Sequence, residues 1–76
     1  MSGRPEKHSL TLRGHRTSVT LEPEFWAAFR EIARAEGRGI NDLAAEVDAE
    51  RGGERGLASA IRVHVLTWLQ EHSAKV

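Results

Sequence analysis

Residues 16–21, RTSVTL, constrain the fold of this chain most, because they alternate like a strand and stand just before Pro23. Successive strand side chains point to opposite faces, so the stretch has one partly apolar face and one polar face. The first face comprises Thr17, Val19 and Leu21, and the second comprises Arg16, Ser18 and Thr20. A lone strand leaves its backbone groups unpaired, so we expect its partner to come from a second copy of the chain.

A chain of 76 residues forms one small domain and buries only about 60% of its unfolded surface. Oligomerisation is the natural compensation, since the chain contains no cysteine for a disulfide or a thiolate metal site. The first ten residues, MSGRPEKHSL, lack the apolar core of a signal peptide, and no apolar run reaches the length of a membrane span. We therefore expect a cytoplasmic protein.

The charges are unevenly distributed, although the formal net charge is zero. Residues 1–20 carry four Lys or Arg against one Glu, which gives +3, and residues 21–76 carry seven against ten, which gives −3. The neutral total argues against a strongly nucleic-acid-binding surface, whereas the basic segment favours one. A merely solvated basic tail remains the alternative.

Three helices are expected after the strand. Pro23 suits a first helical position, and apolar residues at helical spacing predict helices over residues 23–36, 40–50 and 57–72. Gly37 provides a left-handed cap, and the stretch RGGERG separates the last two helices. Residues 1–8 are read as a flexible basic arm. The stretch SLTLR at 9–13 echoes SVTL, and it either extends the ribbon as an outer strand or is loose.

The third helix is apolar around much of its circumference, so it needs to be covered on more than one side. We expect it to complete a dimer core or to mediate higher assembly, with Trp68 at the centre of the contact. The expected dimer core comprises Val19, Leu21, Phe25, Phe29, Ile32, Leu43, Val47, Ile61, Val65 and Trp68.

Residues 16–47, RTSVTLEPEFWAAFREIARAEGRGINDLAAEV, resemble the ribbon-helix-helix family of MetJ/Arc-type DNA-binding proteins. The third helix is similar to the last segment of a subgroup of bacterial ribbon-helix-helix domains. The resemblance implies a mainly α fold: an intertwined homodimer with an intermolecular two-stranded antiparallel β-ribbon, plus a third C-terminal helix. It also implies that outward strand residues contact bases, here Arg16, Ser18 and Thr20.

The resemblance further implies a phosphate anchor at the start of the second helix, here Gly39, Ile40 and Asn41, with Arg38 beside it. Exposed N–H groups and the helix dipole suit that chemistry. Arg13 and His15, next to the strand, are further candidates for phosphate contacts. Gly39 departs from the family pattern, since many members have a Ser or Thr hydroxyl there.

The sequence thus predicts a dimeric, sequence-specific regulator of transcription that inserts a β-ribbon into the major groove of double-stranded DNA. The alternative is a protein–protein interaction module or antitoxin-like dimer whose main partner is another protein. No enzyme motif, cofactor or metal site is expected. His64 and His72, for example, are eight residues apart on a helix, or about 12 Å, too far for one ion.

Overall fold

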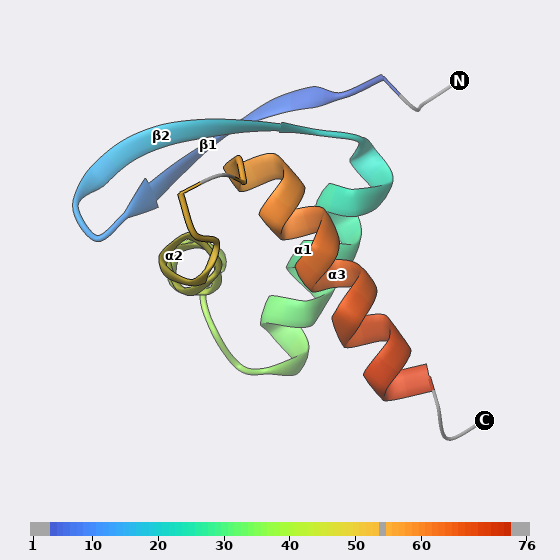
Figure 1. Cartoon of the computed structure of the whole chain (residues 1–76). Coiled ribbons are helices and arrows are strands. Elements are labelled where there is room, and N and C mark those ends of the chain that lie inside the picture. Colours follow the sequence, from blue (N-terminus) through green and yellow to red (C-terminus); the bar gives the residue numbers. More distant parts are fainter. Residues whose placement is uncertain (1–3, 54, 74–76) are drawn as a thin grey trace.

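The computed structural model describes residues 4–53 and 55–73, which form a β-hairpin lying over three helices (Figure 1). The elements are β1 (Glu6–Leu12), β2 (His15–Leu21), α1 (Pro23–Ala35), α2 (Ile40–Glu50) and α3 (Leu57–Ser73). The expected order of a strand followed by three helices is confirmed, with one further strand in front of it.

The hairpin turns through two residues only. Leu12 pairs with His15, and the residues between them, Arg13 and Gly14, have φ angles of 53° and 89°. Two successive positive φ angles characterise a type I′ turn, whose twist matches the right-handed twist of the flanking strands. The Arg13-Gly14 turn therefore folds β1 directly back onto β2.

The expected origin of the partner strand was wrong. β1 pairs antiparallel with β2 from Glu6 opposite Leu21 to Leu12 opposite His15, so one edge of β2 is occupied by its own chain. The stretch SLTL lies in β1 and is not loose. The expected flexible arm over residues 1–8 also needs correction, since residues 6–8 begin β1, while residues 1–3 lie outside the described part.

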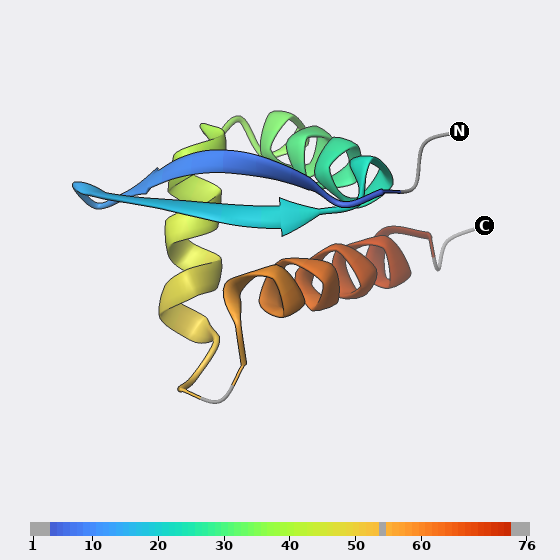
Figure 2. The ribbon, with the colours of Figure 1, turned by 90° about the horizontal axis from the view of Figure 1, so that it is seen from above.

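The inner face of the hairpin packs on the helices and closes a single hydrophobic core. Seen from above, α2 crosses beneath the half of the hairpin near its turn, while α1 and α3 lie on opposite sides of its long axis (Figure 2). Eight of the ten residues expected in a dimer core are buried within one chain: Val19, Leu21, Phe29, Ile32, Leu43, Val47, Ile61 and Val65. The other two, Phe25 and Trp68, are partly buried. The core also includes Leu10 and Leu12 of β1 and four alanines, none of which is among the ten residues expected there.

The end of α1 shows why α1 and α2 are separate helices. Gly37 has a φ of 67°, its N–H donates to the carbonyl of Arg34, and the N–H of Arg38 donates to the carbonyl of Ala33. This is the Schellman arrangement, in which a left-handed glycine allows the last carbonyls to be satisfied. The predicted cap at Gly37 is confirmed. It ends α1, so that α2 begins as a separate helix at Ile40.

The third helix packs on its own chain through Ala60, Ile61 and Val65, which are buried. The guanidinium of Arg62 donates two hydrogen bonds to one carboxylate oxygen of Glu22, at 3.0 and 2.9 Å, and so ties α3 to the residue that joins β2 to α1. On α3, Val63, Leu66 and Leu69 remain 40–54% exposed. Across residues 4–53 and 55–73, no helix is both long and apolar enough to cross a membrane.

Candidate nucleic-acid interface

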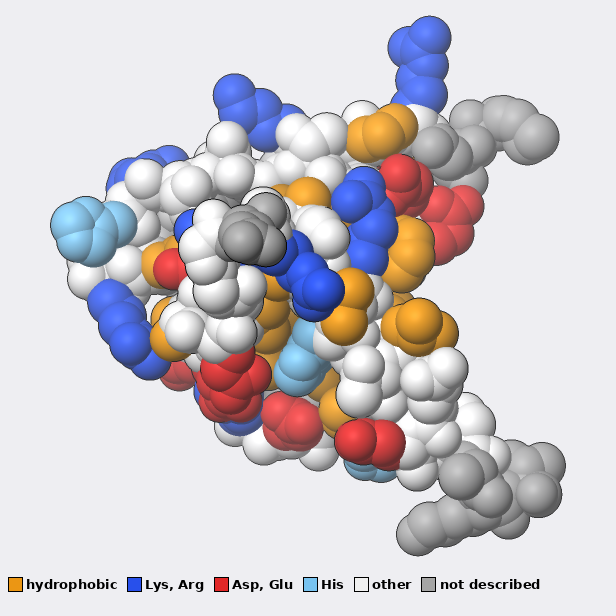
Figure 3. All heavy atoms as spheres, in the orientation of Figure 1, with side chains coloured by type: hydrophobic (Ala, Val, Ile, Leu, Met, Phe, Trp, Pro, Cys, Tyr) orange, Lys and Arg blue, Asp and Glu red, His pale blue; other side chains and the backbone are white. Residues whose placement is uncertain are grey.

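The outer face of the hairpin is a polar surface turned away from the helices. It carries three cross-strand pairs: Lys7 with Thr20, Ser9 with Ser18, and Thr11 with Arg16. All six side chains are exposed. The face combines two cations with four hydroxyl groups and includes no carboxylate. In Figure 3, Lys and Arg side chains project from the upper surface, while most Asp and Glu side chains in view lie lower, over the helices.

A two-stranded ribbon of this kind has suitable dimensions for the major groove of B-form DNA. Neighbouring strands lie about 4.8 Å apart, and the groove, about 12 Å wide, admits a two-stranded ribbon. Ser and Thr side chains are short, so they allow the ribbon to approach the base edges closely. The predicted base-contacting residues Arg16, Ser18 and Thr20 all lie on this face.

Sequence reasoning missed the other half of the face, which consists of Lys7, Ser9 and Thr11. The signal for it is the echo between SLTL and SVTL, which left an additional strand as one of two alternatives and did not single out these three side chains. The turn gives no matching signal, because Arg13-Gly14 is not among the usual Asn-Gly or Asp-Gly hairpin turns.

The tip of the hairpin carries two of the expected phosphate-contacting residues. Arg13 is in the turn, and His15 begins β2, and both side chains are exposed. Both residues flank the end of the ribbon at which Thr11 and Arg16 face outward. Arg13 therefore adds a cation at this end of the outer face, whereas His15, opposite Leu12, lies at an inward-facing position of the ladder.

The N-terminus of α2 lies beside the same end of the ribbon. The side-chain oxygen Oδ1 of Asn41 accepts a hydrogen bond of 3.0 Å from the backbone N–H of Thr11. Gly39 is the N-cap and has extended backbone angles. Because glycine has no side chain, no side-chain hydrogen bond caps this helix. The first N–H groups of a helix have no intrahelical acceptor. Of the expected phosphate anchor, the structure thus brings Gly39, Ile40 and Asn41 next to β1.

Arg38, just before this helix, is already engaged by carboxylates. Its guanidinium contacts Glu46 at 2.6 Å and Glu36 at 3.5 Å, and it donates to the carbonyl of Asp42 at 3.4 Å. The hydrogen bond with Glu46 raises the pKa of Arg38 above its usual value. A phosphate at Arg38 would therefore compete with the carboxylates of Glu46 and Glu36.

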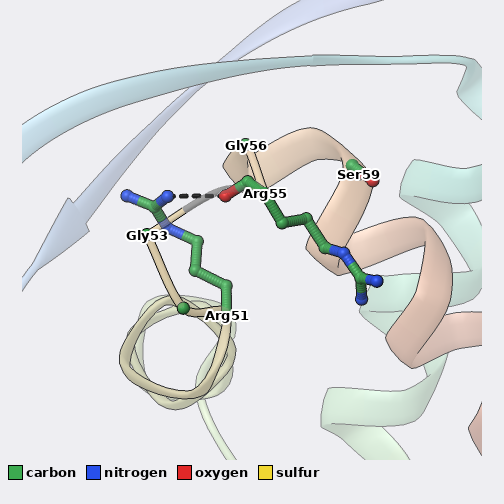
Figure 4. Close-up of a pocket in the computed structure, with 6 residues that line it drawn as sticks. Arg51, Gly53, Arg55, Gly56 and Ser59 are labelled. Carbon is green, nitrogen blue, oxygen red and sulfur yellow. Dashed lines mark hydrogen bonds between the residues drawn. The ribbon is translucent and has the colours of Figure 1, made fainter.

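Two arginines, Arg51 and Arg55, line an open hollow at the junction of α2 and α3 (Figure 4). The other residues that line it are Gly52, Gly53, Gly56 and Ser59. Arg51 donates to Asp48 at 2.6 Å and to the carbonyl of Arg55 at 2.6 Å. Arg51 therefore fastens the loop to the end of α2. The described residues contain no cluster of three His, Asp or Glu side chains arranged for a metal ion.

Comparisons with known proteins agree with this architecture. Residues 5–69 match the ribbon-helix-helix domain family, whose members are generally DNA-binding regulators. Among solved structures, an uncharacterized protein from Bordetella pertussis Tohama I is similar, with a TM-score of 0.77 and 30% sequence identity. The alignment covers 99% of this chain and 64% of that one, so this chain spans less than two thirds of its relative. No curated protein matches. Because the family match covers most of the length of this chain, the chain belongs to the ribbon-helix-helix domain family.

Proposed function

We propose that this protein binds double-stranded DNA by inserting the outer face of the hairpin into the major groove, and that it regulates transcription in the cytoplasm by occupying a short operator. The observation that carries the proposal is a two-stranded ribbon with an exposed outer face of two cations and four hydroxyls. Arg gives bidentate hydrogen bonds to guanine, and Ser and Thr bond to either type of base edge. Arg16, Ser18 and Thr20 contact bases.

Contacts to phosphate supply the remainder of the affinity. We assign these contacts to Arg13 and His15 at the hairpin tip and to the first N–H groups of α2, next to Thr11. Because each phosphate contact releases a counterion, affinity falls as the salt concentration rises.

The test begins with selection of bound duplexes from a random DNA library, followed by gel shifts of the selected duplex at two salt concentrations. We expect Arg16→Ala to weaken specific binding by about 1–3 kcal/mol, the usual value of one bidentate base contact. Arg34→Ala is the matched control, because Arg34 is exposed on α1 and pairs with Glu31. Failure to enrich any duplex, or equal affinity of Arg16→Ala and the unaltered protein, contradicts the proposal.

A second candidate function is association with another protein, here a second copy of the chain. Val63, Leu66 and Leu69 stand three residues apart on α3 and remain exposed. Within residues 57–73 the single Arg is balanced by a single Glu, so two α3 helices meet without net repulsion. Sedimentation equilibrium tests this candidate: we expect a dimer that Leu66→Lys dissociates, and a monomeric unaltered protein rules it out.

A further inference from the structure

The two strands of the hairpin repeat one hexapeptide. Residues 7–12 read KHSLTL, and residues 16–21 read RTSVTL, so each position has its counterpart nine residues later. The outward residues are equivalent in type: Lys7 corresponds to Arg16, and Ser9 and Thr11 correspond to Ser18 and Thr20. Two of the three inward positions are aliphatic in both copies.

The register of the hairpin converts this repeat into a local two-fold symmetry. Ser9 pairs with Ser18, which is also its counterpart in the repeat, so the local axis passes between these two residues. The N–H of Thr11 donates to Asn41 and not to β2. Since bonded and non-bonded pairs alternate in an antiparallel ladder, Ser9 and Ser18 are also a non-hydrogen-bonded pair, at which such an axis is allowed.

The axis arranges the outer face as two equal halves. Lys7 and Arg16 lie at diagonally opposite corners, Thr11 and Thr20 at the other two, and the serines lie in the centre. Strand propensity does not explain why Ser9 and Ser18 occupy the centre of this face, since Ser is not among the residues enriched in strands. Two small hydroxyl side chains at the axis do allow the middle of the ribbon to approach the groove floor.

The two-fold symmetry does not extend to the residues of the hairpin that contact the helices. His8 and Thr17 are counterparts in the repeat, but the ring of His8 stacks on Trp26 with centroids 3.9 Å apart. The N-terminus of α2 lies beside Thr11 of β1. The repeat is thus most complete on the face that carries no packing constraint.

We propose that one chain of this protein reads a short inverted repeat in DNA, with Lys7, Ser9 and Thr11 contacting bases in one half as Arg16, Ser18 and Thr20 do in the other. This inference rests on the proposed function, and it differs from a ribbon shared between two chains. The diagonal cations are four residues apart along the ribbon, about 14 Å. At about 3.4 Å per base pair, the two recognised positions are roughly four base pairs apart.

The experiment compares Lys7→Ala, Arg16→Ala and Lys7→Arg on the selected duplex, with Arg34→Ala as the control and thermal unfolding as the check of folding. We expect selected sites to be short inverted repeats, and Lys7→Ala and Arg16→Ala each to weaken binding by about fivefold or more. Lys7→Arg retains or tightens binding, because it makes the two halves alike and Arg is the better guanine ligand.

The outcomes separate the two proposals. If Arg16→Ala weakens binding and Lys7→Ala, equally well folded, leaves it unchanged, the single-chain inverted repeat is overturned while DNA binding stands. Selected sites without inverted symmetry overturn it as well. If the unaltered protein binds no duplex, both proposals fail.

Discussion

Asn41 joins the start of α2 to the edge of β1, since its Oδ1 accepts the backbone N–H of Thr11 at 3.0 Å. We expect Asn41→Ala to lower the free energy of unfolding by about 1 kcal/mol, because the Thr11 N–H loses its protein acceptor. Asn41→Asp keeps an acceptor oxygen and serves as the control. Urea unfolding measures both variants, and equal losses in the two would show that the hydrogen bond contributes nothing.

The turn of the hairpin depends on Gly14, whose φ of 89° is in the left-handed region. A methyl group at Gly14 meets nothing within 4 Å, so Gly14→Ala acts through backbone strain alone. We expect a loss of about 1 kcal/mol in stability by thermal unfolding. Gly53→Ala, in equally open space and without a positive φ, should cost less. A Gly14→Ala protein as stable as Gly53→Ala contradicts the type I′ turn.

Leu10 tests whether β1 belongs to the core. It is 2% exposed, and truncating a buried leucine to alanine costs about 2–5 kcal/mol. Arg30→Ala, at an exposed position on α1, should cost about 0.5 kcal/mol or less. Chemical denaturation measures the two variants side by side, and similar small losses would mean that residues 9–13 are loose after all.

The contact between Glu22 and Arg62 makes stability depend on pH. A hydrogen bond from the backbone of Glu22, followed by the one from Arg62, lowers the pKa of the Glu22 carboxyl. Because the folded pKa is depressed, this contribution is present above the unfolded value of 4.5 and is lost as the pH falls through the folded value.

Glu22→Gln should therefore melt below the unaltered protein at pH 7, with the difference shrinking under acid conditions. Glu71→Gln, at an exposed position on α3, controls for the loss of one carboxylate. A difference in melting temperature that is independent of pH would exclude this role of Glu22.

The helices follow from local signals in the sequence. The predicted bounds of α1 and α2 agree with the observed bounds to within one residue. The signals are Pro23, Gly37 and the spacing of apolar residues, which all act over a few neighbouring residues. The polar face of β2 follows equally from alternation. These local features are also the ones that indicate the family.

The partner strand does not follow from the sequence, because pairing is decided beyond the neighbouring residues. Arginine at φ 53° is an unusual residue for a type I′ turn, so Arg13-Gly14 does not mark a hairpin. With Leu10 and Leu12 in place, one chain closes the core, and among the large apolar side chains of the described residues only the row through Leu66 stays exposed.

The most direct test of the single-chain ribbon is an isotope-filtered NOE experiment on labelled and unlabelled protein that were unfolded together and refolded as a mixture. The Hα atoms of Ser9 and Ser18 face each other in a non-hydrogen-bonded pair, where strands are closest. We predict a strong Ser9–Ser18 cross-peak within one labelled chain and none between labelled and unlabelled chains. A cross-peak found only between chains would contradict the account.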